Sequence, residues 1–245
     1  MTEGRTIAIA SGKGGVGKTW FAITLAHALA RQGNRVLLFD ADLGLANVDI
    51  QLGLTPKQDL GGVIAGRATL ADAVVHQTEG GFAIVAGHSG SGALSAIEPA
   101  ALERVLAALH GETVHYDMVL LDLGAGLDRS VRRMSAWADT MLVLATDEPT
   151  SLTDAYAVIK LYAADRPQGD ARIVVNQAAT RQAGQRTFAT LERACQTFLG
   201  RAPKLAGIVR RDDRVRDAIR RQTLLVTRYP TSPAAADVEA VARSL

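Results

Sequence analysis

The segment from Ser11 to Thr19, which reads SGKGGVGKT, constrains the fold of this chain more than any other feature. It follows the apolar run Thr6–Ala10 and precedes Lys18–Gln32, where apolar residues recur at helical spacing. Residues 12–19 match the pattern G-x-x-x-x-G-K-[ST], in which glycines let backbone N–H groups curl around phosphate oxygens. The sequence therefore predicts a strand, a phosphate-binding loop and a helix in succession.

This loop supplies most of the predicted nucleotide contacts. Its members are Gly12, Lys13, Gly14, Gly15, Val16, Gly17, Lys18 and Thr19, and Trp20 follows them. We expect Lys18 to reach the β- and γ-phosphates and the Thr19 hydroxyl to complete a Mg²⁺ shell. Lys13 is a second lysine near the start of the loop, placed too far along it to duplicate Lys18 easily; the alternative interpretation is a solvated loop side chain.

The composition is that of a folded protein that remains in a reducing compartment. The 245 residues are 48% hydrophobic and 21% charged, which suits one α/β domain spanning residues 1–245. A net charge of +2 gives no general signature of polyanion binding. The single cysteine, Cys195, cannot form an internal disulfide, and we see no signal peptide or membrane-length apolar run. We therefore expect a cytoplasmic protein.

Strand-length apolar runs alternate with helix-period segments along the chain, which predicts βα units on a mostly parallel sheet flanked by helices. The predicted strands are Thr6–Ala10, Arg35–Phe39, Phe82–Ala86, Met118–Asp122, Thr140–Ala145, Arg172–Asn176 and Lys204–Val209. The predicted helices are Lys18–Gln32, Leu60–Gly66, Leu70–His76, Ala100–His110, Ser130–Ala136, Ser151–Ala164, Arg181–Leu199, Asp213–Arg221 and Ala234–Ser244. We expect the Gly- and Ser-rich stretch His88–Glu98 to be a mobile loop.

Three aspartates follow or close predicted strands, where ligands of parallel sheets bind. Asp40 and Asp42 come after the second strand, so one can lie near a metal and the other near the attacking water. Asp122 closes the fourth strand as a Mg²⁺-binding aspartate does, and Gly124 and Gly126 can sense a γ-phosphate. The alternative is that these aspartates only cap or solvate loops.

Asn176 closes the sixth predicted strand. Its amide offers a donor and an acceptor, which suits the edge of an adenine base. Asparagine is also a common turn former, and the residues alone leave both interpretations open.

Taken together, these residues resemble the MinD/ParA family of deviant Walker A ATPases over nearly the whole chain. The resemblance is nearer to the flagellar-number branch of that family (FlhG, FleN, YlxH). The residues that carry it are DADLGLANVD (40–49), LGLTP (52–56), EPTSLTDAY (148–156) and YPTSP (229–233), together with the KGGVGKT loop.

The resemblance implies a P-loop NTPase with a doubly wound sheet, which binds ATP and Mg²⁺, forms an ATP-dependent homodimer and hydrolyses slowly as a switch. It assigns Lys13 to the nucleotide of the partner subunit, Asp42 to the attacking water, and Asp40 and Asp122 to the metal. It makes Asn176 an adenine contact. Arg210 stands where relatives place a proline near the adenine, and Trp20 stands where they have a smaller residue.

The resemblance also suggests partners. Members of the branch stimulate an FlhF-like GTPase through an N-terminal extension, which we do not expect here because the first strand begins almost at Met1. A flagellar regulator or basal-body protein is a further candidate. The segment Pro233–Leu245 has one arginine, two acidic residues and no aromatic anchor, so it predicts a packed helix and does not support membrane binding.

Other functions remain as alternatives. The arginine-rich run Arg210–Arg221 would suit a ParA-type DNA-segregation ATPase, although Asp–Arg pairs at helical spacing favour a solvated face. An electron donor of the nitrogenase-reductase type needs two cluster-ligating cysteines, and a dethiobiotin synthetase-like ligase would lack the stretch 40–49. These two enzymes are therefore not expected, and an ATP-sensing binder with little turnover is the second alternative that remains.

Overall fold

Eight strands form one sheet in the computed structural model, which describes residues 3–87 and 97–245. The strands are β1 (Arg5–Ser11), β2 (Val36–Ala41), β3 (Val74–Gln77), β4 (Phe82–Val85), β5 (Met118–Ala125), β6 (Thr140–Ala145), β7 (Asp170–Ala178) and β8 (Lys204–Arg210). Their order in the sheet is β3-β4-β2-β5-β1-β6-β7-β8. Among the described strands, only β3 and β4 pair antiparallel, so the predicted mostly parallel α/β sheet is confirmed.

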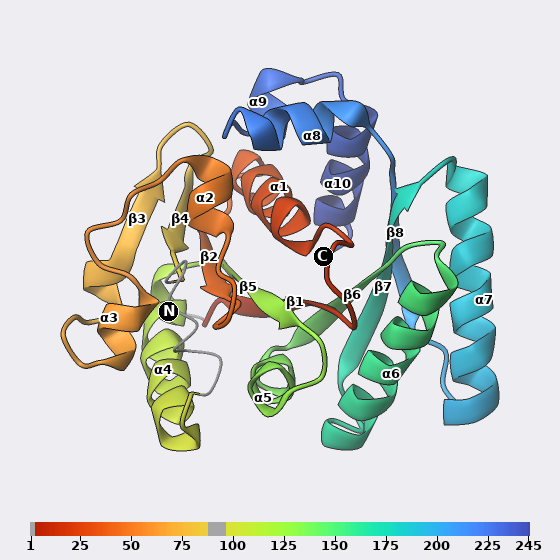
Figure 1. Ribbon diagram of the computed structural model, residues 1–245, viewed down its shortest axis with the longest axis horizontal. Helices are drawn as coiled ribbons and strands as arrows, with labels where there is room; N and C mark the ends of the chain where they lie inside the picture. Colours follow the sequence, from red (N-terminus) through yellow and green to blue (C-terminus); the bar gives the residue numbers. More distant parts are fainter. Residues whose placement is uncertain (1–2, 88–96) are drawn as a thin grey trace.

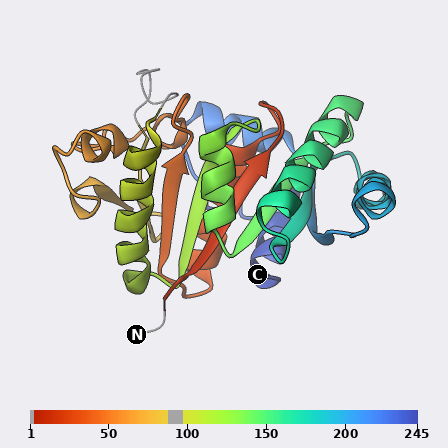
Figure 2. The ribbon, with the colours of Figure 1, turned by 90° about the horizontal axis from the view of Figure 1, so that it is seen from below.

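Helices cover both faces of this sheet (Figures 1 and 2). They are α1 (Lys18–Arg31), α2 (Val48–Leu52), α3 (Leu60–Ile64), α4 (Pro99–Glu112), α5 (Arg129–Trp137), α6 (Pro149–Asp165), α7 (Arg181–Leu199), α8 (Asp213–Arg220), α9 (Leu225–Arg228) and α10 (Pro233–Arg243), with short 3₁₀ turns at Ala71–Ala73 and Thr113–His115. Helices α1, α8, α9 and α10 lie over one face, whereas α4, α5 and α6 lie over the other.

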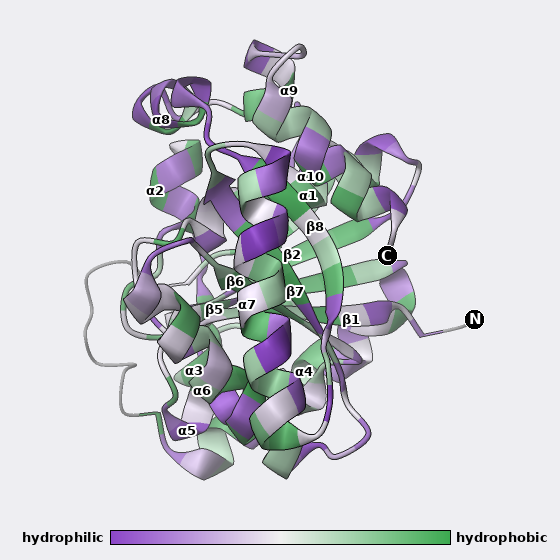
Figure 3. Cartoon of the chain, turned by 90° about the vertical axis from the view of Figure 1, so that its right-hand side faces the viewer, coloured by the Kyte–Doolittle hydropathy of each residue, from purple (hydrophilic) through white to green (hydrophobic). Residues whose placement is uncertain are grey.

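Alternate residues of the strands fill two separate cores, one on each face of the sheet. Ala8 and Ala10 of β1 pack with the layer of α4 to α7, whereas Ile7 and Ile9 pack with α1 and α10. All four residues are at most 1% exposed. A strand apolar at every position fits this arrangement, because both of its faces are covered. Figure 3 shows the same pattern, with hydrophobic strands between helices whose outer sides are hydrophilic.

The prediction of a helix over Leu70–His76 is wrong. The chain makes a single 3₁₀ turn at Ala71–Ala73 and then strand β3, which pairs antiparallel with β4. The β-branched residues Val74 and Val75 suit a strand, and Gly81, at φ +69, occurs in the connection to β4. The short helices α2 and α9 were not predicted.

Five strands extend beyond their predicted ends. β2 runs past Phe39 to Ala41, so Asp40 lies inside this strand and does not follow it as predicted. β5 continues past Asp122 to Ala125, and β7 continues past Asn176 to Ala178. Asp122 and Asn176 therefore lie inside strands rather than closing them. Strand pairing continues beyond each residue, to Ala125 in β5 and to Ala178 in β7, with an irregular register in both cases.

The last helix, α10, packs into the core beside α1, as its composition predicts. Six of its residues are buried: Ala234, Ala235, Asp237, Val238, Val241 and Ala242. Among the described residues, no helix combines the length and apolarity that crossing a membrane requires. The predicted loop His88–Glu98 lies mostly outside the described residues.

Candidate nucleotide-binding site

The phosphate-loop prediction is confirmed as local structure, because β1 leads through residues 12–17 directly into α1. Gly17 caps α1 in the left-handed conformation, at φ +87, with no side chain bonded to the first turn. That turn also contains no acidic residue. The partly positive end of the helix is therefore left to an external anion, as phosphate binding requires.

Lys18 lies inside the loop and is 9% exposed. Its Nζ donates to Ser11 Oγ at 3.0 Å, and Ser11 Oγ donates to the carbonyl of Lys13 at 2.7 Å. Burial lowers the pKa of Lys18, while the charges of Asp122 and Asp42 oppose that effect. The sequence reasoning missed Ser11, although its place directly before the loop could have indicated it.

Lys13 points away from Lys18, toward the start of α6. Its Nζ contacts Glu148 Oε2 and lies 3.2 Å from Thr150 Oγ1. Both partners belong to the EPTSLTDAY segment, but their contact with Lys13 was not predicted. The Lys13 side chain thus lies outside the phosphate-binding site that its own loop forms, and 30% of that side chain is exposed.

The loop is braced by the neighbouring strands and helices. Asn176 Nδ2 donates to the carbonyl of Val16 at 2.7 Å, and Gln177 Nε2 donates to that of Gly15 at 3.3 Å. A Cβ on Gly12 would lie 2.5 Å from Cβ and the carbonyl oxygen of Asp154, so only glycine fits there. Asn176 is 3% exposed, and in this position it supports the loop; its contact with adenine stays a prediction.

Asp40 and Asp122 face each other in register on β2 and β5 and are buried to 1% exposure or less. Asp40 accepts hydrogen bonds from the backbone N–H groups of Asp42, Asn47 and Val48, at 3.0 to 3.2 Å. Burial raises the pKa of both carboxyls; the charge of Asp122 adds to this for Asp40, whereas Lys18 opposes it for Asp122.

These carboxyls fit a Mg²⁺ ion. Asp122 Oδ1 is buried without a hydrogen-bond partner among the described residues, and the Asp122 carboxylate also bonds to Thr19. Mg²⁺ takes one or two carboxylates and completes its shell with phosphates and waters, so one buried carboxylate oxygen without a partner suits it. Asp40 is more engaged with backbone than Asp122, so its role at the metal stays a prediction.

Asp42 lies beside the glycine segment that follows Asp122. Its Oδ1 accepts from the N–H groups of Gly44 and Leu45, at 3.2 and 2.9 Å. A Cβ on Gly124 would lie 3.3 Å from the same oxygen. The structure thus brings Asp42, Gly124 and the phosphate loop to one edge of the sheet, and the Asp42 carboxylate is only partly buried.

A cleft of about 290 Å³ beside the loop is lined by Gly15, Gly17, Trp20, Asn176 and Arg210. The predicted base-binding residues are therefore grouped in one place. The Arg210 guanidinium, however, bonds to Asp237 of α10, with Nε at 2.7 Å and Nη2 at 2.9 Å from the carboxylate. Arg210 is thus held against the C-terminal helix.

The arginine-rich helix α8 is hydrophilic over most of its length (Figure 3), and its Asp217 pairs with arginines that follow the helix. Asp217 accepts from Arg221 at 3.0 Å and from Arg228 at 3.2 Å. Both arginines lie beyond the end of α8, so these ion pairs do not engage the arginines of the helix itself, and the DNA-binding alternative is left to experiment.

Fold and site together define a P-loop nucleotide-binding domain. Residues 7–226 match the model of the CobQ/CobB/MinD/ParA nucleotide-binding domain, and the chain belongs to this family. It is 40% identical over 241 residues to the antiactivator FleN of Pseudomonas aeruginosa, covering 98% of this chain and 86% of FleN. It is 31% identical to the flagellum site-determining protein YlxH of Helicobacter pylori, over 76% of this chain and 62% of YlxH.

A solved structure gives the same result. The septum site-determining protein MinD of Pyrococcus horikoshii, complexed with Mg-ADP, superposes with a TM-score of 0.81 at 25% identity, over 98% of this chain and 95% of that one. The expected family, nucleotide and metal are thus confirmed at the level of the family. The role of each residue in the site is not tested by this likeness.

Proposed function

We propose that this protein is a slow, Mg²⁺-dependent ATPase that dimerises around ATP and regulates the number or placement of flagella. The observation that carries the proposal is the pair of lysines in one loop. Lys18 is buried inside the cradle, whereas Lys13 lies outside it on Glu148 and Thr150. Because Lys13 does not contact the phosphate site of its own loop, it can turn to the nucleotide of a second subunit when it leaves Glu148. The flagellar assignment is supported by the similarity to FleN and YlxH.

In the proposed reaction, Lys18 and the N-terminal N–H groups of α1 hold the β- and γ-phosphates of ATP. Asp42 orients the attacking water and accepts its proton. Thr19 and Asp122 hold Mg²⁺, with Asp40 beside them. The bound metal would neutralise developing charge on the phosphates. Lys13 of each subunit completes the site of the other, so hydrolysis depends on dimerisation.

The test measures ATP hydrolysis and, by size-exclusion chromatography with light scattering, the mass of the protein with ATP or ADP. We expect wild type to dimerise only with ATP, Asp42→Ala to dimerise without turnover, and Lys13→Ala to stay monomeric. Lys160→Ala, which removes an exposed lysine of α6, is the matched control and behaves as wild type. A Lys13→Ala protein that dimerises normally would refute the assignment of Lys13.

The same assay separates the alternatives. Dimers that form with ATP but never hydrolyse it would indicate an ATP-sensing binder. ATP-dependent binding to DNA that is lost with the arginines of α8 would indicate a segregation ATPase. Partner binding is supported only by analogy, since a MinD of Aquifex aeolicus was solved in complex with MinC. Pull-down with an FlhF-like GTPase or a flagellar regulator, with and without ATP, tests that part.

A further inference from the structure

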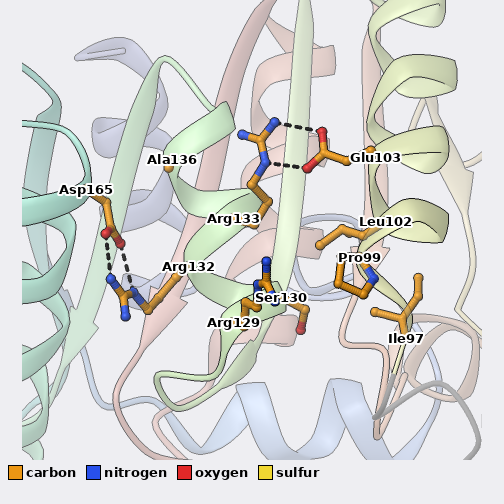
Figure 4. A pocket seen from close by; sticks show the side chains of 10 residues that line it. All are labelled: Ile97, Pro99, Leu102, Glu103, Arg129, Ser130, Arg132, Arg133, Ala136 and Asp165. Carbon is orange, nitrogen blue, oxygen red and sulfur yellow. Dashed lines mark hydrogen bonds and ion pairs between the residues drawn. The ribbon is translucent and has the colours of Figure 1, made fainter.

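A groove of about 670 Å³ lies between α4 and α5, on the face of the sheet opposite α1 (Figure 4). Its inner surface includes Ile97, Leu102 and Ala136, which are apolar. Leu102 is 4% exposed and packs into the core, so the floor of the groove is firmly held. The groove is separate from the nucleotide site, and none of its lining residues belongs to the phosphate loop.

The walls of the groove are polar and carry more positive than negative charge. Arg133 forms two bonds to Glu103 across the groove, at 2.6 and 2.8 Å, and Arg132 forms two to Asp165, at 2.8 and 2.5 Å. Arg129 is different, because it is exposed and its guanidinium has no ion pair or hydrogen bond to any described residue. Figure 4 shows the two paired guanidinium groups and, lower on the same helix, Arg129 without a partner.

The position of Arg129 makes an unpaired cation there unfavourable. It is the first residue of α5, directly after the capping residue Asp128. The N-terminal end of a helix carries partial positive charge, so a cation is destabilising there and a bound anion is stabilising. The Asp128 carboxylate caps this end of α5 by accepting from the Val131 N–H at 3.0 Å, so an incoming carboxylate would pair with the Arg129 guanidinium.

The groove also adjoins the segment expected to respond to the γ-phosphate. Gly126, at φ +107, and Leu127, which is 38% exposed, connect β5 to α5. β5 contains Asp122 and Gly124. A molecule bound along α5 would therefore contact the helix that directly continues this segment.

We propose that the groove between α4 and α5 docks an acidic amphipathic segment of a partner protein. An apolar side chain of that segment would pack on the partly exposed Ile97 and Ala136, and a carboxylate would pair with Arg129. The apolar floor and the single free arginine favour a peptide over a nucleic acid, because polyanion binding depends on many cations that are free for phosphates. This proposal goes beyond the ATPase cycle and does not depend on it.

The first experiment selects short random peptides, displayed on phage, against the immobilised full-length protein. Binders to an Arg129→Glu variant are removed in a counter-selection. We expect the recovered peptides to combine Leu or Phe with Asp or Glu. The consensus peptide should bind wild type about tenfold more tightly than Arg129→Glu, by fluorescence anisotropy. Arg104→Glu, the same change at an exposed arginine of α4 outside the groove, should bind as wild type does.

The second experiment locates the bound peptide. Ser130→Cys places a thiol in the groove, and the native Cys195 is fully buried, so iodoacetamide should modify only the new cysteine. The consensus peptide should slow this alkylation. It should leave the alkylation of Ala107→Cys, on the exposed side of α4, unchanged.

Several results would overturn the proposal. Peptides without acidic enrichment, equal losses with Arg129→Glu and Arg104→Glu, or alkylation of Ser130→Cys that the peptide does not slow would each do so. Competition by duplex DNA or anionic vesicles at the same concentration would show general anion binding instead. If Arg129→Glu prevents dimerisation with ATP, the groove is a contact between copies of the chain. Failure of the Lys13 test alone would leave the groove proposal standing, since peptide binding is measured without nucleotide.

Discussion

The replacement Asp122→Asn should stabilise the protein in the absence of metal and nucleotide. Asp122 and Asp40 are two buried carboxyls in register on adjacent strands, with Lys18 as the nearby cation. Asparagine keeps the shape and the bond to Thr19 but removes one of the two charges. The folded protein no longer has to bury that charge.

The magnitude follows from the pKa of Asp122, which burial raises from 3.8 to about 7. The folded state then holds the proton more tightly than the unfolded chain, so its stability is greatest below pH 4 and falls as the pH rises through 7. At about 1.4 kcal/mol per pKa unit, this ionisation costs roughly 2 kcal/mol at pH 5.5 and roughly 4 kcal/mol at pH 8. The advantage of Asp122→Asn should therefore widen by about 2 kcal/mol between these two values.

The assay is urea unfolding followed by tryptophan fluorescence at both pH values, with EDTA present. The lowered pKa of His27 also changes stability in this range, but it acts equally on both proteins and cancels in their difference. Asp147→Asn, at an exposed site, is the matched control and should show no widening gap. Added Mg²⁺ should stabilise wild type at pH 8 and have a smaller effect on Asp122→Asn.

A gap that stays constant between pH 5.5 and pH 8 would refute this reasoning. It would mean that the Asp122 carboxyl ionises in the folded protein as easily as in the unfolded chain. A variant that is less stable than wild type at both pH values would also refute it. That result would mean that the hydrogen bonds of the Asp122 carboxylate stabilise the fold by more than the burial of its charge costs.

Three further predictions follow from packing and burial. Gly12→Ala should destabilise the protein by about 2 kcal/mol in thermal or urea unfolding and abolish ATP binding, because its Cβ would lie 2.5 Å from Asp154; an ordinary melting temperature with intact binding would contradict this. Asn176→Ala should weaken ADP binding about tenfold by isothermal titration calorimetry, because the carbonyl of Val16 loses its donor at 2.7 Å; unchanged affinity would show that the loop needs no brace. Cys195 should react with a thiol reagent only on unfolding, because it is buried and its pKa is raised to about 11; rapid labelling of the native protein would contradict its placement.

Much of the site could be predicted because its chemistry is contiguous in sequence. The glycines, Lys18 and Thr19 form one run, and a parallel sheet brings strand ends to one edge whatever the details of packing. The meeting of Asp40 and Asp122 follows from that rule, although neither the register between β2 and β5 nor the extension of β5 past Asp122 was visible in the sequence.

Contacts between distant side chains could not be predicted. The bonds of Lys13 to Glu148 and of Asn176 to Val16 join residues 135 and 160 positions apart. They depend on rotamers and on where α6 and β7 sit against the loop, which no local pattern encodes. The prediction of a helix in place of β3 failed for another reason. Over four residues, helical and strand periodicity cannot be told apart, and the pairing with β4 decides which structure forms.

The order of the strands has a consequence for how the molecule opens. β2, β5, β1 and β7, which carry or brace the site, each have neighbours on both sides, whereas the outermost strands are β3 and β8. Local opening begins where backbone hydrogen bonds are fewest, so amide hydrogens of β3 should exchange with solvent first. Those of β1 and β5 should exchange only when the whole sheet unfolds. We therefore expect the strands that support the phosphate loop, β1 and β5, to be among the slowest to exchange their amide hydrogens.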